Sequence, residues 1–298
     1  MNHRINSFDY NAFKSLIGAI SLSATISLGH AETSPPDPDG GLISNWQNNT
    51  SKSQDEQPHW ESLLGMGSPR LTQGFRYNYA RRYLANGASL ENYGMGKGLD
   101  LIVDSNFEMQ IGLPAYLVDK QSRGIESSGW ADEVLLGRYR FISANEAEGN
   151  YIVSGSLGVG MPTGSGQFSV HRSVFTPTLA AGKGWGTRLR GFSIQSSLSA
   201  SVPEGNLSAI GVPAVWATAF QGHAFRYVWP EIETAYTHWY KGANAGKNQL
   251  VLTYGAVFGR YEIEGRKRLT LGIGYREPVG TSFNTFIREW ISMLKLSF

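Results

Sequence analysis

The chain has 298 residues, no cysteine and a formal net charge of +2 at pH 7. This near-neutral charge gives no electrostatic basis for binding nucleic acid, and the lack of cysteine excludes disulfides, thiolate chemistry and Cys-ligated metals. Aromatic residues make up 12% of the chain and the mean hydropathy is −0.25. Such a composition is typical neither of a disordered chain nor of a helical membrane protein.

The N-terminus has the pattern of an export signal. Arg4 and Lys14 precede a short apolar run over residues 15–28, and Ala31 supplies a small residue at a cleavage point. The run is shorter than the ~20 apolar residues that a spanning helix needs. The pattern therefore predicts a cleavable signal peptide over residues 1–31, with an uncleaved amphipathic anchor as the alternative.

Residues 32–68 differ in composition from the rest of the chain. They are rich in Pro, Ser and Asn, and Trp46 and Trp60 are their two large aromatic residues. Such a composition is typical of a linker. Two interpretations stay open: a disordered periplasmic tail, or a plug that enters a barrel and is anchored there by the two tryptophans.

From Leu71 onward, apolar and polar residues alternate, as in Phe75-Arg76-Tyr77. Alternation predicts strands, because successive side chains point to opposite faces. The second face is mostly Gly, Ser, Gln and Thr, which favours a barrel interior over the water-facing side of a soluble sandwich. The alternating segments run over 71–84, 97–103, 107–118, 130–142, 150–162, 173–183, 189–202, 208–221, 224–240, 248–262, 268–277 and 287–298.

Twelve segments is an even number, as single-chain bacterial barrels require. Short and long connections alternate, which is expected when both termini lie on the periplasmic side. The sequence therefore predicts an all-β fold: a single transmembrane antiparallel β-barrel of about twelve strands over residues 69–298, with up-and-down topology. Aromatic residues near the strand ends predict girdles at the two membrane boundaries. These residues are Tyr83, Tyr116, Trp130, Tyr139, Phe141, Tyr151, Phe175, Trp216, Phe220, Trp229, Tyr236, Trp239, Phe258 and Trp290.

The last segment, Trp290 to Phe298, has one apolar face and ends in an aromatic residue. It resembles the closing strand of Gram-negative outer-membrane barrels, in which the terminal aromatic helps the barrel-assembly machinery to recognise the chain. The resemblance implies that Phe298 is an assembly signal. The alternative is an ordinary edge strand that ends in Phe.

Several glycine-rich stretches are similar to one known family. They cover residues 98–116, 135–141, 158–164 and 176–186, and the third contains the turn Pro162-Thr163-Gly164. Together they resemble the outer-membrane family named for the MetA-pathway of phenol degradation. The resemblance implies a transporter-like barrel that admits small aromatic or other hydrophobic compounds. It implies no particular site residues.

The alternation also predicts which charged side chains face the lumen. Charges of both signs in a narrow lumen either pair into a network that braces and blocks the barrel or line a polar path, and the sequence leaves both open. The candidate lumen-lining residues are Arg76, Arg82, Glu108, Arg138, Arg140, Glu231, Glu233, Arg276, Glu289 and Lys295.

His171-Arg172-Ser173 is a candidate catalytic site, because outer-membrane phospholipase A is also a barrel and uses a His-x-Ser-Asn-Gly-type motif. On one strand face, His171 and Ser173 would lie close enough to act as base and nucleophile. Val174 and Phe175 stand where that motif has Asn and Gly. We therefore expect no catalytic residues and no enzyme.

Other site types have little support in the sequence. His59, His223 and His238 are widely spaced and have no carboxylate at ligand spacing, so we expect no metal site and no cofactor. Glu231 and Glu233 share a face, as paired catalytic acids do. The favoured interpretation is that both are lumen charges that lie opposite arginines.

These observations predict a Gram-negative outer-membrane channel for passive passage of small solutes. The alternatives are a lipid-modifying barrel enzyme and a structural barrel without a permeant. The expected partners are outer-membrane lipids, the barrel-assembly machinery and small-molecule solutes, with no nucleic acid. The permeating solute, the openness of the lumen and the oligomeric state stay open.

Overall fold

The computed structural model describes residues 41–298 except 123, 188, 281 and 282. The predicted signal peptide over 1–31 lies outside the described residues. The chain divides into two units, Met1–Asn45 and Trp46–Phe298, and every strand that the structure describes lies in the second. Helix α2 (Leu42–Asp55) begins in the first unit and continues into the second. Among the described residues, no helix is long and apolar enough to cross a membrane.

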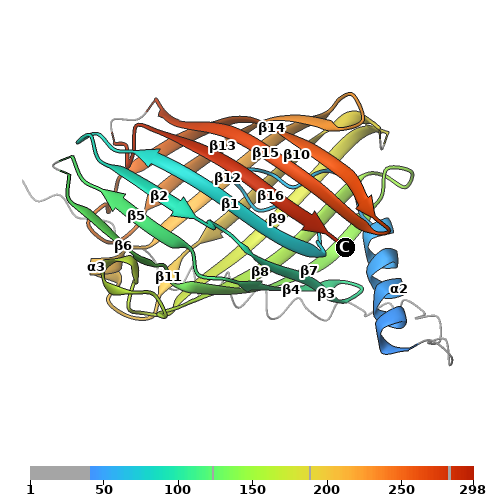
Figure 1. Cartoon of the computed structure of the whole chain (residues 1–298), viewed down its shortest axis with the longest axis horizontal. Coiled ribbons are helices and arrows are strands. Elements are labelled where there is room, and N and C mark those ends of the chain that lie inside the picture. The colour runs from blue at the N-terminus through green and yellow to red at the C-terminus, as the bar shows by residue number, and fades with distance from the viewer. Residues whose placement is uncertain (1–40, 123, 188, 281–282) are drawn as a thin grey trace, which may run out of the picture. The chain divides into compact units, whose positions relative to one another are not determined.

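The second unit is built from sixteen strands in one antiparallel sheet (Figure 1). Two very short helical turns, η1 (Gly166–Phe168) and α3 (Leu207–Ile210), lie in the connections. The strands are β1 (Gly74–Tyr83), β2 (Ser89–Tyr93), β3 (Gly98–Asp104), β4 (Phe107–Gly112), β5 (Tyr116–Lys120), β6 (Glu126–Trp130), β7 (Glu133–Ala144), β8 (Tyr151–Met161), β9 (Val174–Thr187), β10 (Arg190–Ala200), β11 (Val202–Pro203), β12 (Pro213–His223), β13 (Val228–Trp239), β14 (Asn248–Glu264), β15 (Lys267–Val279) and β16 (Arg288–Ser297).

Some of these strands are the two halves of one longer strand. Ile111 of β4 pairs with Leu135 of β7, and in the same register Tyr116 of β5 pairs with Trp130 of β6. The break between β4 and β5 contains Pro114, which lacks the N–H that a ladder bond needs. In the same way β2 and β3 both pair with β1, and β11 extends β10 along β9. The sixteen strands therefore form twelve barrel strands.

The sheet closes on itself. β16 pairs with β15 on one side and with β1 on the other, so that Trp290 lies opposite both Tyr275 and Arg81. The predicted closed antiparallel barrel of twelve up-and-down strands is confirmed. Several predicted boundaries are wrong. The predicted connection over 85–96 contains β2, and residues 71–73 precede β1. Residues 208–212 and 224–227 lie outside the strands to which they were assigned.

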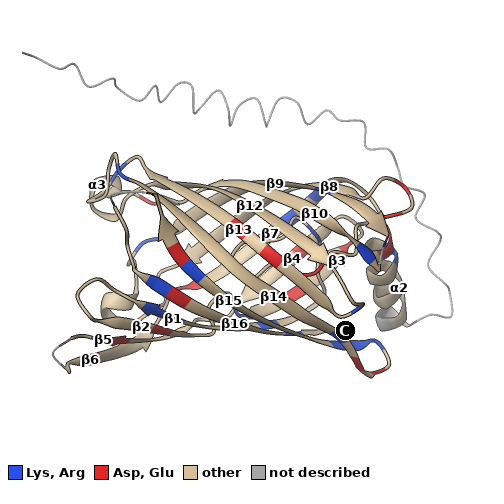
Figure 2. Cartoon of the chain, turned by 90° about the horizontal axis from the view of Figure 1, so that it is seen from above, with Lys and Arg blue, Asp and Glu red and all other residues tan. Residues whose placement is uncertain are grey.

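The outer face of the barrel is apolar. Along β16, Trp290 and Leu294 point outward and are 48% and 43% exposed, whereas Met293 and Lys295 point inward and are buried. Most of the length of the strands carries no charge (Figure 2). A closed barrel with such an outer face presents to its surroundings the surface that lipid requires.

Exposed aromatic residues lie toward the two ends of the strands, as predicted. Pairs such as Tyr116 with Trp130 and Trp185 with Phe192 have ring centroids 5.1 and 4.9 Å apart. Two residues that were predicted to join the girdles do not. Trp229 is 3% exposed and shares the inward face of β13 with Glu231, and Trp239 lines an internal cavity.

Candidate functional site in the barrel lumen

Residues 56–73, here called the inserted segment, run inside the barrel between α2 and β1. They form no strand of their own, and Leu63, Leu64 and Leu71 are at most 1% exposed. The buried side chain of Gln57 joins the two ends of the segment: its amide donates to the carbonyl of Leu71 over 2.8 Å and accepts from the Leu71 N–H over 2.9 Å. The segment is therefore a closed loop whose tip, residues 64–68, reaches furthest from α2.

Two glutamates of β13 hold the tip by its backbone. The N–H of Leu64 donates to Glu231 over 2.9 Å. The N–H of Gly65 donates to both carboxylate oxygens of Glu233, over 3.0 and 2.9 Å. Both glutamates are 3% exposed. Both side chains point inward, the direction that the alternation predicts. Glu231 also accepts from the side-chain amide of Gln221 over 2.8 Å. Sequence spacing cannot reveal these partners.

Arginines hold the carbonyl groups of the same segment. Arg76 donates through Nη2 to Leu63 and Leu64 over 2.8 and 3.2 Å. Arg138 donates through Nη1 to the carbonyl of Arg70 over 2.9 Å. Peptide donors at Leu64 and Gly65 and peptide acceptors at Leu63, Leu64 and Arg70 are therefore paired inside the barrel, where an unpaired group would be costly.

The end of the segment is bound by a second polar cluster. Glu108 pairs with Arg138 over 2.7 Å and also accepts a hydrogen bond from the N–H of Thr72. The Thr72 hydroxyl donates to Asp100 over 2.9 Å. Asp100 faces inward on β3 and is 5% exposed, and it was not among the predicted lumen residues. Asp100 stands between Leu99 and Leu101, and this alternation would have predicted that its side chain points into the lumen.

Leu64 fits into a socket made of glycines. A Cβ atom on Gly272 would lie 2.6 Å from Leu64 Cδ2, and one on Gly274 would lie 2.9 Å from Leu64 Cδ1. A Cβ on Gly255 would also collide with Leu64. These contacts are shorter than van der Waals distance, so the inward glycines of β14 and β15 leave the space that this leucine fills.

Trp60 fits against the opposite part of the barrel in the same manner. A Cβ on Gly182 or Gly184 of β9 would lie 2.5 or 2.6 Å from the indole ring. The indole is 8% exposed. One of the two predicted tryptophan anchors is therefore buried in the lumen.

Arg260 is a lumen residue that the alternation missed. It donates to Glu61 over 2.8 Å and, through Nη2, to the carbonyls of His59 and Trp60 over 2.6 and 2.9 Å. A bulge between Gly259 and Tyr261 breaks the register, and Arg260 has a φ of 57°. Without the bulge, the side chain would point outward.

The ten predicted lumen residues all point into the barrel. Seven bind the inserted segment or the end of α2, and three form a separate cluster in which Arg82 and Arg276 contact Glu289 over 2.9 and 2.7 Å. The seven are Arg76, Glu108, Arg138, Arg140, Glu231, Glu233 and Lys295.

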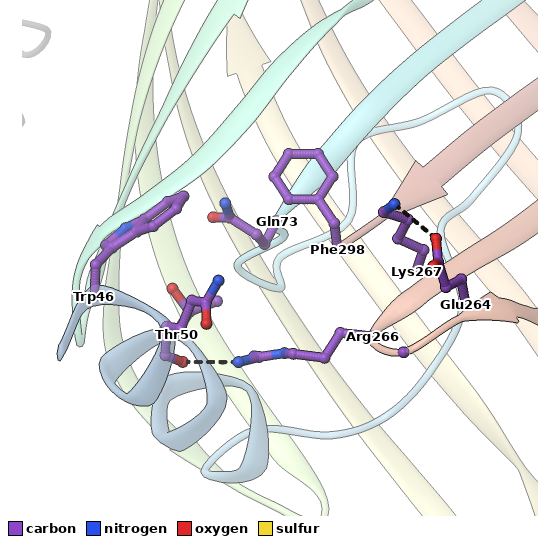
Figure 3. A pocket seen from close by; sticks show the side chains of 9 residues that line it. Trp46, Thr50, Gln73, Glu264, Arg266, Lys267 and Phe298 are labelled. Atoms are coloured by element: carbon purple, nitrogen blue, oxygen red, sulfur yellow. Dashed lines mark hydrogen bonds and ion pairs between the residues drawn. The ribbon is translucent and has the colours of Figure 1, made fainter. Parts of the chain in front are cut away.

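A pocket of 370 Å³ lies at the mouth of the barrel, where α2 and the C-terminus meet (Figure 3). Arg266, in the turn between β14 and β15, donates to the Ser51 hydroxyl over 2.6 Å. The Trp46 indole donates to the Ile102 carbonyl over 2.7 Å. Phe298 lines the same pocket. The helix from Trp46 onward is therefore hydrogen-bonded to β3 and to the turn between β14 and β15.

One titratable pair lies at this mouth, in the turn between β7 and β8. Glu146 accepts from the His59 backbone N–H over 2.6 Å and contacts His59 Nδ1 over 2.7 Å. Burial raises the pKa of Glu146, but the hydrogen bonds from the side chain and backbone of His59 outweigh burial and lower this pKa to about 2. The carboxylate is therefore ionised when it binds the start of the inserted segment.

A larger cavity, of 420 Å³, lies beyond the tip of the inserted segment. The tip residues Gly65, Met66, Gly67 and Ser68 form its floor, and inward side chains from strands around the barrel form its walls. The lumen thus consists of a filled middle and an open space on the side away from α2.

His171 and Ser173, for which the sequence predicts no catalytic role, lie in a bend before β9 and not on a strand face. His171 has a left-handed φ of 57°. The two side chains therefore do not share the strand face on which a base and a nucleophile would be aligned. Across the described part of the chain, no three His, Asp or Glu side chains gather as metal ligands.

No protein-family model and no curated protein matches the sequence. Solved structures of similar topology include an outer-membrane channel from Pseudomonas putida F1, with a TM-score of 0.48 and 12% identity over 79% of this chain and 98% of that chain. The KdgM porin has a TM-score of 0.43 and 9% identity over 75% and 99% of the two chains. The NanC porin has a TM-score of 0.43 and 8% identity over 75% of this chain and 98% of that chain. Similarity at such low sequence identity is informative about the fold alone. The resemblance to the family named for the MetA-pathway of phenol degradation therefore stays a prediction.

Proposed function

We propose that this protein is an outer-membrane channel for small solutes whose lumen is closed at rest by the inserted segment. The observation that carries the proposal is a closed barrel with an apolar outside and a polar inside, filled at its middle and open beyond. Barrels of eight strands are filled by side chains and barrels of sixteen to eighteen hold an aqueous channel, so twelve strands leave room for a peptide loop.

The inserted segment is suited to act as the movable part. It contributes no ladder bond to the barrel, so its displacement breaks no pairing between strands. Its backbone is held by hydrogen bonds to charged side chains of the wall, which water can replace once the lumen is wet. Opening therefore requires rearrangement of residues 56–73 and leaves the barrel wall intact.

The family resemblance leads us to propose compact hydrophobic or aromatic solutes as permeants. Met66, Val215 and Ala217 line the cavity and supply an apolar contact surface within it. The serines and threonines of the neighbouring strands would hydrogen-bond to polar substituents. A different resemblance, that of the strand ending in Phe298 to closing strands of outer-membrane barrels, is the basis for proposing insertion by the barrel-assembly machinery of a Gram-negative cell.

Conductance in planar bilayers tests the proposal. Three versions of the chain are compared: the full protein, a deletion of residues 32–68, and a matched deletion of residues 32–45 that keeps the inserted segment. We expect low conductance from the first and third, and from the second a higher conductance and uptake of larger solutes in liposomes. Equal conductance from all three would contradict closure by the segment. Closed behaviour of all three, with no solute uptake, would instead favour a structural barrel.

A further inference from the structure

The cavity beyond the tip has one cationic wall. Arg82 of β1 and Arg276 of β15 share a single carboxylate, Glu289, over 2.9 and 2.7 Å. Glu289 is 2% exposed, whereas the side chain of Arg82 is 32% exposed. Both arginines line the cavity and Glu289 does not. Two guanidinium groups with one carboxylate leave a positive charge at the cavity surface.

The acids that balance the arginines of the cavity are more deeply buried than the arginines. Among the described residues, four charged side chains line the cavity: Arg82, Arg138, Arg276 and Glu233. Glu233, which accepts from the N–H of Gly65, is 3% exposed. Glu108, the partner of Arg138, is 1% exposed. The charged groups that a solute can touch are therefore mainly guanidinium groups, above all that of Arg82.

Two further walls have different chemistry. β8, β9 and β10 supply hydroxyl groups from Ser154, Thr178 and Ser197, and in the strand order they lie across the barrel from β15, β16 and β1. Between them, Val215 and Ala235 of β12 and β13 pack with Met66 of the tip into an apolar patch.

We propose that this cavity is a binding site for a small organic monocarboxylate with a compact apolar body, such as a benzoate-type acid. The carboxylate binds Arg82 and Arg276, with charge-assisted hydrogen bonds to groups that Glu289 leaves available. The apolar body lies on the patch around Met66, and hydroxyl substituents meet the serine and threonine wall. The volume of 420 Å³ is within the range of small-ligand sites.

The proposal deepens the proposed channel function by naming the chemical class of its solute, and direct binding tests it without transport. Isothermal titration uses the full-length protein in detergent, with benzoate as ligand and benzyl alcohol as the neutral ligand of similar shape. We expect saturable binding of benzoate that weakens by about tenfold in Arg276→Gln and in Arg82→Gln, the loss expected for one charge-assisted hydrogen bond. Benzyl alcohol should bind the wild type no better than benzoate binds these variants.

The matched control is Arg288→Gln. Arg288 lies next to Glu289 on β16, but it is exposed on the outside and stacks on Tyr83, so benzoate binding should be unchanged. If Arg276→Gln fails to fold, Arg82→Gln decides, because its partly exposed side chain leaves the buried pair of Arg276 and Glu289 in place. Equal binding of benzoate and benzyl alcohol, unchanged affinity in the arginine variants, or no binding to the wild type would each overturn the proposal. A channel that conducts but does not bind benzoate would refute this inference alone.

Discussion

Single residues decide how the inserted segment is held. Leu64 has room only because Gly255, Gly272 and Gly274 lack side chains, and these glycines have ordinary extended backbone, so their conformational freedom is not the reason for their presence. The reason is space. Overpacking of a tightly packed site is destabilising by about 1–3 kcal/mol, which is enough to shift a loop out of its seat.

Gly272→Val should therefore displace Leu64 and raise the single-channel conductance. Its Cβ would lie 2.6 Å from Leu64 Cδ2, and the glycine is flanked by strand partners that cannot move away. Adding Leu64→Ala to Gly272→Val frees that space and should bring the conductance back toward the wild-type value. Leu271→Val, on the lipid-facing neighbour, is the control and should change nothing. An unchanged conductance in Gly272→Val would show that Leu64 does not help to close the lumen.

The pair of Glu146 and His59 predicts a pH dependence. The pKa of Glu146 is lowered to about 2 in the folded protein, against an ordinary value of 4.5. A lowered carboxyl pKa contributes stability that is present above the ordinary value and is lost as the pH falls through the folded value. The midpoint of thermal unfolding should therefore fall between pH 4.5 and pH 2 more steeply in the wild type than in Glu146→Gln.

Circular dichroism of the detergent-solubilised protein measures this difference. Glu148→Gln, an exposed residue of the same turn, is the control and should keep the wild-type profile. If Glu146→Gln and the wild type lose stability in parallel, the contact with His59 does not stabilise the fold.

At the residue scale, alternation was a good guide to direction and a poor guide to partners. It placed Glu231, Glu233 and Lys295 inside, because a strand gives each side chain one of only two directions. It missed Arg260, because a bulge adds a residue and reverses the direction that follows. Gly259, immediately before it, was the available signal, since a glycine within a strand often marks a bulge.

At the scale of elements, strands were predictable where a long alternating run is uninterrupted. β10, β14 and β16 are examples. β2 was missed because five residues, Ser89 to Tyr93, are too few to show a period. The inserted segment has no period at all, since its polar backbone is satisfied by side chains of strands far away in sequence. Only the tertiary structure brings Leu64 to Glu231.

β16 gives the next prediction. It completes the ring by pairing with both of its neighbours, and Phe298 follows it at the mouth of the barrel. Deleting Phe298 should reduce the amount of assembled barrel in the outer membrane, while export still occurs. Phe298→Tyr keeps the aromatic ring and should assemble normally. Quantitative immunoblots of membrane and periplasmic fractions measure both variants, and a normal yield after the deletion would show that the terminal ring is not a signal.

At the scale of the whole molecule, the closed ring of ladder bonds predicts resistance to detergent. No strand of the barrel has an unpaired edge at which unfolding could begin, since β1 and β16 are hydrogen-bonded to each other. The purified membrane fraction should therefore run faster in SDS gels before boiling than after it. A single position under both conditions, or isolation of the protein as a soluble periplasmic species, would contradict a membrane barrel.

The seam between β1 and β16 also constrains the order of assembly. Gly74 pairs with Ser297, so this contact joins residues nearly at opposite ends of the barrel sequence, and closing so long a loop comes late on entropic grounds. The inserted segment is joined directly to β1 and is surrounded by the finished ring. While the seam is open, the nascent cylinder can wrap around residues 56–73 sideways; once it has formed, they can enter only through the mouth. β16, the last strand in the sequence, is therefore the strand that encloses residues 56–73, which precede all the others.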